Sequence, residues 1–167
     1  MAILLIALGS CAAQKAVNSD DKTPDNISKT TYEQALDALD EQKFTIKIAE
    51  FHFPSGKESV IFATHSYISM LGNYGTIRFS PDLAPRSPMD HLNAEDNAAE
   101  ITKGKRKKNG DMFYCMKIYG THPWQRNKIL ITLYKNSNKC FIQIKGTRLE
   151  ATILSIKGYV YPLKEDE

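Results

Sequence analysis

The amino-acid sequence predicts an all-β fold with one short N-terminal helix. From Lys43 onward, apolar and polar residues alternate over short segments, which is the period of half-buried strands. Turn dipeptides separate these segments, and Asn109-Gly110 is the strongest of them. About eight or nine antiparallel strands exceed what a flat sheet holds well, so we expect a meander that curls into a barrel or folds over as a sandwich. The barrel-like form is favoured.

The helix is expected to begin at Thr30. The residues from Thr30 to Glu33 fit a capping box, in which Thr30 accepts a hydrogen bond from the backbone of Glu33 and the Glu33 side chain reaches back. Apolar residues then recur at helical spacing, at Tyr32, Ala35, Leu36 and Leu39. This apolar face is predicted to cover one side or end of the sheet.

The first strand is expected to start at Lys43 and to contain a β-bulge near Ala49-Glu50, because the apolar positions change parity there. Further strands are expected at residues 59–63, 65–71, 74–79, 98–107, 111–119, 129–134, 139–145 and 153–161. Residues 80–97 contain three prolines and little periodicity. We expect this segment to be an irregular loop, either functional or a variable insertion without a role. A closed version of the sheet would be a lipocalin-like barrel.

Composition limits the classes of protein to consider. The 167 residues, 42% of them hydrophobic, suit one globular domain with one core. The formal net charge of +3 is too small to require a polyanion as partner. We therefore expect no nucleic-acid partner.

The N-terminus indicates export. An apolar run from Ala2 to Leu8 ends in Leu8-Gly9-Ser10-Cys11, which looks like a lipobox whose Cys11 thiol accepts a diacylglyceryl group. No basic residue precedes the run, which departs from the usual signal peptide. An upstream start, a shortened segment or an apolar element of a cytoplasmic domain are the alternatives. A run of seven residues is too short to span a membrane, which takes about 20.

This interpretation divides the chain into four parts. They are a lipoprotein signal segment at residues 1–10, a flexible tether at 11–29, a single β domain at 30–163 and a tail at 164–167. The tether is predicted because its residues are polar and include Pro24. Lipidated Cys11 would anchor the chain in a membrane, so we expect a location in the bacterial cell envelope, at the outer membrane, on its periplasmic or surface face.

Known catalytic and metal motifs do not frame the reactive residues. The histidines stand outside hydrolase, metal and nucleotide motifs; they are His52, His65, His91 and His122. We therefore expect no enzyme, no catalytic residue and no cofactor. Cysteine spacing does not fit zinc, so no metal site is expected. Strand alternation also turns Cys115 away from Cys140, which argues against a disulfide between them.

Two surface features are candidate binding residues. Lys105, Arg106 and Lys107 belong to the densest basic run, which could hold an anionic glycan or lipid headgroup or could simply be a solvated tip that discourages edge-to-edge association. Trp124 lies in a connection between strands. Its indole could stack on a sugar or insert into a partner, or it could cover one end of the core.

Three segments of the C-terminal half carry a family resemblance: NGDMFY at 109–114, ITLYKN at 131–136 and GYVYPL at 158–163. Between Lys43 and Leu163 the chain resembles an uncharacterised lipoprotein family of Bacteroidales-type bacteria, domain of unknown function 4251. The resemblance implies an envelope location and an all-β domain. It brings no catalytic or binding residues to positions of this chain.

These features together predict a membrane-anchored envelope lipoprotein of unknown biochemical function. We expect a binding or interaction module for a small apolar ligand, a glycan or an envelope protein. The apolar ligand enters because inward-facing rows could line a cavity if the barrel were wide enough. The alternatives are a hydrolase of unrecognised type and a structural scaffold of the envelope.

Overall fold

The computed structural model describes residues 29–52, 61–62, 65–80, 92–120, 126–146 and 151–163, with only the backbone for 61 and 62. The predicted signal segment, nearly all of the predicted tether and the predicted tail lie outside the described residues. Cys11 and Trp124 lie outside them too, as do His91 and His122. The predictions made for these residues stay predictions.

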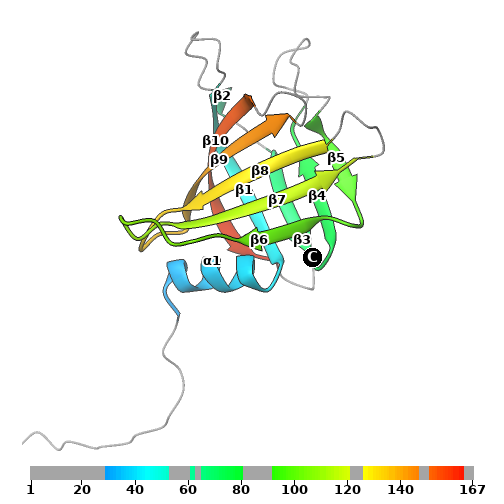
Figure 1. The fold of residues 1–167 in the computed structure, drawn as a ribbon. Coiled ribbons are helices and arrows are strands. Elements are labelled where there is room, and N and C mark those ends of the chain that lie inside the picture. The colour runs from blue at the N-terminus through cyan, green and yellow to red at the C-terminus, as the bar shows by residue number, and fades with distance from the viewer. Residues whose placement is uncertain are drawn as a thin grey trace, which may run out of the picture.

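The predicted helix is confirmed as α1 (Thr31–Asp40). Its capping box is formed: the Glu33 backbone N–H donates to Thr30 Oγ1 at 3.3 Å, and the Thr30 N–H donates to Glu33 Oε2 at 2.9 Å. Ala35, Ala38 and Leu39 are buried on one face of the helix. Because α1 packs mainly against β10 and β1, it closes one side of the sheet (Figure 1).

The predicted all-β fold is confirmed, and the described strands form one antiparallel sheet. The strands are β1 (Lys43–His52), β2 (Ile61–Phe62), β3 (Tyr67–Leu71), β4 (Tyr74–Arg78), β5 (Ala94–Asp96), β6 (Glu100–Lys103), β7 (Met112–Tyr119), β8 (Arg126–Leu133), β9 (Lys139–Gly146) and β10 (Thr152–Pro162). Their order is β5-β4-β3-β1-β10-β9-β8-β7-β6, and β2 pairs with β1. The sheet is strongly curled, as Figure 1 shows.

In the middle of the sheet, β1 pairs with β10 and so joins the N-terminal strands to the C-terminal ones. This register runs from Phe44 opposite Pro162 to His52 opposite Ser155, and it shifts between Ile48 and Glu50. The predicted bulge at Ala49-Glu50 is therefore confirmed. Such a bulge increases the local twist, which helps the sheet to curl.

The prediction of an irregular loop over residues 80–97 is wrong at its C-terminal end, where Ala94–Asp96 form β5 and pair with β4. The strand has three residues, and Ala94 and Asp96 are its buried positions. An alanine and an aspartate do not give the strong apolar alternation from which strands are recognised. The sequence therefore gives little sign of this strand.

One core fills the inner side of the curled sheet. Side chains with 0% exposure come from strands in both halves and include Phe44, Ile68, Met116, Ile131 and Ile142. Ala35, Ala38 and Leu39 of α1 belong to the same cluster. Among the described residues, no helix combines the length and apolar character needed to cross a bilayer.

Candidate functional site

A groove opens where the two edges of the sheet meet. β5 and β6 follow each other in the chain but lie at opposite ends of the strand order, and the curl brings β5 against β7. The hollow measures about 440 Å³, and we call it the seam groove. It is lined by Tyr74, Glu95, Asp96, Asn97, Tyr119 and Gly120.

Asp96 holds the two edges together at the base of this groove. Its side chain is 7% exposed, and both of its oxygens accept backbone hydrogen bonds. Oδ1 accepts from the N–H of Ala98 at 2.9 Å, and Oδ2 accepts from the N–H of Tyr119 at 2.6 Å. Both oxygens of Asp96 are thus occupied by backbone hydrogen bonds, so the role of this side chain is structural.

Glu95 stands on the opposite face of β5 and orders the rim. Its Oε1 accepts from Arg78 at 2.6 Å, and its Oε2 accepts from the Tyr74 hydroxyl at 3.0 Å. The hydrogen bond to Glu95 raises the pKa of Tyr74, since an ionised phenolate could not donate it. These bonds fix the side chains without using all of the lone pairs of the Glu95 carboxylate.

Two phenol rings mark the outer part of the groove. Tyr74 is 45% exposed and Tyr119 is 41% exposed, so both rings present aromatic surface to solvent. Asn97, also exposed, adds an amide that can both donate and accept. The seam groove therefore offers flat aromatic surface beside oriented polar groups. Among the described residues, no group of His, Cys, Asp and Glu is arranged to hold a metal ion.

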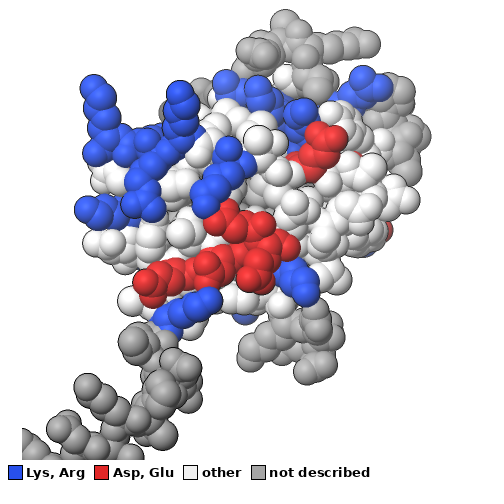
Figure 2. Space-filling view, turned by 60° about the horizontal axis from the view of Figure 1, so that its bottom comes forward, with Lys and Arg blue, Asp and Glu red and all other residues white. Residues whose placement is uncertain are grey.

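A second surface feature lies at the tips of two hairpins and is called the basic end; it comprises Lys105, Arg106, Lys107, Lys108 and Lys135. All five side chains are exposed. Figure 2 shows Lys and Arg side chains gathered at this end of the molecule. The predicted candidates Lys105, Arg106 and Lys107 are thus brought together with Lys135, which comes from the separate β8–β9 turn.

Backbone contacts hold the basic end in place. The Lys107 N–H donates to the Asp111 carbonyl at 2.8 Å, and the Gly110 N–H donates to the Lys107 carbonyl at 2.9 Å. The Asp111 side chain accepts from Asn109 at 2.7 Å and from the N–H of Lys135 at 3.0 Å. Gly110 has a φ of +94°, the left-handed region that glycine tolerates. The predicted Asn109-Gly110 turn is confirmed, and Asp111 ties it to the neighbouring hairpin.

The described histidines and cysteines do not form a reactive cluster. His52 contacts Glu50 at 3.1 Å, and His65 is an exposed turn residue with a φ of +66°. Cys115 and Cys140 are free thiols, as expected from their opposite faces. Burial raises the pKa of the Cys140 thiol to about 12, so this thiol is protonated and unreactive at neutral pH.

The seam groove was not predicted from the sequence. Its residues come from β4, β5, the segment after β5 and the end of β7, and only the curl of the sheet brings them together. The available signal was the presence of tyrosine at the exposed ends of strands, at Tyr74 and Tyr119. Without the register, this signal does not show that the two rings share a groove.

Comparisons with known proteins agree with the predicted resemblance. No protein-family model matches the chain, and no curated protein matches it. A solved structure does match: a DUF4251 family protein from Bacteroides eggerthii, with a TM-score of 0.61. The fold is that of this DUF4251 protein. The match covers 79% of this chain and 87% of that chain at 18% sequence identity, so it establishes a shared fold.

Proposed function

We propose that the chain is a lipid-anchored binding module of the bacterial cell envelope, of the DUF4251 family, and that the seam groove binds a glycan. The carrying observation is the pairing of two half-exposed tyrosines, Tyr74 and Tyr119, with the polar groups of Glu95 and Asn97 in one hollow. Sugar rings present C–H faces that stack on aromatic rings and hydroxyls that bond to carboxylate and amide groups.

A glycan fits this arrangement better than a small apolar ligand does. The inward-facing rows of β7, β8 and β9 are occupied by fully buried side chains such as Met116, Ile129 and Ile142. A ligand inside the sheet would have to displace these core side chains, at the cost of their packing. The seam groove, in contrast, is open at the surface and has polar groups in its lining.

The anchor part of the proposal depends on Cys11 and on the shared fold. The lipobox-like Leu8-Gly9-Ser10-Cys11 precedes a polar segment that can serve as a tether. Mass spectrometry of the natively produced protein tests it. We expect a mature chain that begins at Cys11 and carries diacylglyceryl, placed at the outer membrane. A native chain that keeps Met1 and a bare Cys11 thiol would refute the anchor.

The glycan site is tested by screening the full chain on a glycan array and measuring affinity for the best ligand by calorimetry. Tyr74→Ala and Tyr119→Ala should each weaken binding by about threefold to tenfold, because each removes one stacking surface. Tyr161→Ala is the matched control, since Tyr161 is 40% exposed but lies on β10, outside the groove. A chain that binds no glycan, or an equal loss in Tyr161→Ala, would refute the site.

A further inference from the structure

The cations of the basic end have no carboxylate partners within the described part of the chain. Arg106 Nε contacts the sulfur of Met112 at 3.3 Å, and Lys107 Nζ contacts the Thr132 hydroxyl at 3.3 Å. Neither contact neutralises charge. Lysines near α1 differ, because Lys29 pairs with Asp37 at 2.6 Å and Lys103 pairs with Asp40 at 2.5 Å. The basic end therefore keeps its positive charge available for an external anion.

The opposite charge is concentrated on α1. The acidic residues of α1 and its C-cap are Glu33, Asp37, Asp40 and Glu41, and Figure 2 shows acidic side chains gathered in one red band. A negative surface would attract the basic end and repel this face of α1. The charge distribution thus selects one orientation of the domain on an anionic plane.

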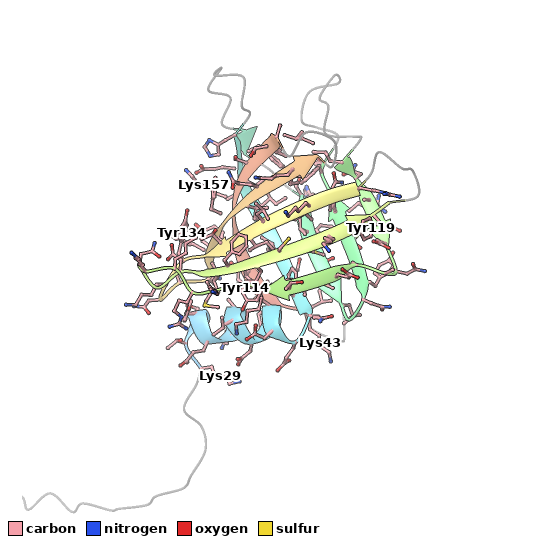
Figure 3. The ribbon with its side chains drawn as sticks, in the orientation of Figure 1. Lys29, Lys43, Tyr114, Tyr119, Tyr134 and Lys157 are labelled. Carbon is pink, nitrogen blue, oxygen red and sulfur yellow. The ribbon has the colours of Figure 1, made fainter. Side chains whose placement is uncertain are left out.

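The position of the N-terminal end of the domain fits the same orientation. Figures 1 and 3 show the N-terminal end of α1, close to Lys29, on the side of the molecule where the hairpin tips lie. Tyr134, which is 39% exposed, stands next to Lys135 on that side. Amphipathic tyrosine rings are favoured at the boundary between water and lipid.

We propose that the basic end is a docking surface for an anionic lipid bilayer. Docking through this surface turns the seam groove away from the membrane. β7 runs from Met112, beside the basic end, to Tyr119, in the groove. Seven residue steps at about 3.4 Å place the two features roughly 24 Å apart. The inference rests on the proposed anchor, because a single lipid chain holds a protein weakly and a basic patch supplies the second attachment.

The test is cosedimentation of the full, unlipidated chain with vesicles. We expect binding to vesicles that contain roughly 30% phosphatidylglycerol, no binding to pure phosphatidylcholine, and loss of binding when salt rises from about 50 mM to about 300 mM. The triple variant Lys105→Gln, Arg106→Gln, Lys107→Gln should lower the partition coefficient by roughly 100-fold, about fivefold for each charge.

The matched control removes three other positive charges, by Lys117→Gln, Lys128→Gln and Lys145→Gln. These residues lie in one row across β7, β8 and β9, away from the hairpin tips. Each triple variant removes three positive charges, so the net charge of the chain falls by the same amount in both. We expect the control to lose less than about fivefold. Equal losses in both variants, or no binding of the wild type, would overturn the docking surface.

Three further readouts complete the design. Tighter binding of a DNA duplex through the same three side chains would overturn the choice of a lipid surface. The thermal unfolding of both triple variants should match that of the wild type, because none of the six side chains is buried. Glycan affinity of the triple variant should be unchanged, so failure of the docking surface and failure of the seam groove are separate results.

Discussion

At the scale of single residues, Tyr114 links the helix to the sheet. Its side chain is 1% exposed, and its hydroxyl donates to Asp40 Oδ1 at 2.8 Å. Lys103 donates to the other oxygen of the same carboxylate and lies 6.0 Å from the centre of the Tyr114 ring. Burial, and then the hydrogen bond to Asp40, raise the pKa of Tyr114 well above its usual value.

The first prediction is a loss of stability at alkaline pH that depends on Tyr114. A phenol whose pKa is raised by folding stabilises the folded state below its unfolded pKa of about 10, and this contribution is lost as pH rises above that value. The wild type should lose up to about 1.4 kcal/mol for each pH unit above about 10. Tyr114→Phe should lack the part of this dependence that Tyr114 contributes.

Urea unfolding from about pH 9 to about pH 12 measures this effect. Near pH 9, Tyr114→Phe should be less stable than the wild type by about 1 kcal/mol, because one hydrogen bond is lost. The difference should shrink as pH rises above about 10 and change sign at about pH 11, because the wild type's loss of up to about 1.4 kcal/mol per pH unit overtakes it. Tyr134→Phe, at a tyrosine that is 39% exposed, is the control and should show a small, constant difference. A Tyr114→Phe difference that is the same across the range would contradict the assignment.

Residue types alone could predict only part of the candidate site. Lys105, Arg106 and Lys107 were recognised because consecutive cations beside a turn are visible in the sequence. Glu95 and Tyr119 were not, because they lie 24 positions apart and meet only through the curl of the sheet. The structural role of Asp96 was also hidden, since its partners are backbone groups of Ala98 and Tyr119.

At the scale of elements, the features that depend on residues close together in the chain could be predicted from the sequence. The α1 cap, the Asn109-Gly110 turn and the bulge at Glu50 each depend on residues within a few positions of one another. β5 was not predicted, because a short edge strand needs neither strong apolar alternation nor β-branched residues. It is held in place by pairing with β4 and by the hydrogen bonds of Asp96. Pairing between β1 and β10 could not be deduced either, since it joins the two ends of the domain.

The second prediction concerns the start of α1. Thr30→Ala removes the side chain that accepts from the Glu33 N–H, so it should lower the free energy of unfolding by about 1 kcal/mol. Thr31→Ala makes the same chemical change one residue later, at an exposed position inside the helix. It should change stability by less than about 0.5 kcal/mol, because alanine is a good helix former. Equal losses in the two variants would mean that the cap does not stabilise the domain.

At the scale of the whole molecule, the curled sheet depends on close approach across the seam. Gly75 on β4 is buried and pairs with Met70 of β3 and Asp96 of β5. A Cβ at this position would lie 2.6 Å from the Cβ of Ala99 and 3.1 Å from the Cε of Met116. The backbone of Ala99 also donates to the carbonyl of Asn73 at 2.9 Å. The absence of a side chain at Gly75 is therefore what lets the two edges meet.

The third prediction follows from this contact. Gly75→Ala should lower the free energy of unfolding by about 1 to 3 kcal/mol, because the added methyl group overpacks the seam. Gly146→Ala is the matched control: its closest neighbour would be the Cδ1 of Ile153 at 3.0 Å, the end of a side chain that is 38% exposed and can move. It should change stability by less than about 0.5 kcal/mol. Urea unfolding gives both values.

A second substitution shows whether the clash with Ala99 is the cause. Ala99→Gly removes the atom closest to the new methyl group, so the double variant Gly75→Ala, Ala99→Gly should recover much of the loss, with a coupling of about 0.5 to 3 kcal/mol. Strictly additive losses would mean that the two edges do not meet at this point. Because the same edges form the seam groove, Gly75→Ala should also weaken glycan binding, whereas Gly146→Ala should leave it unchanged.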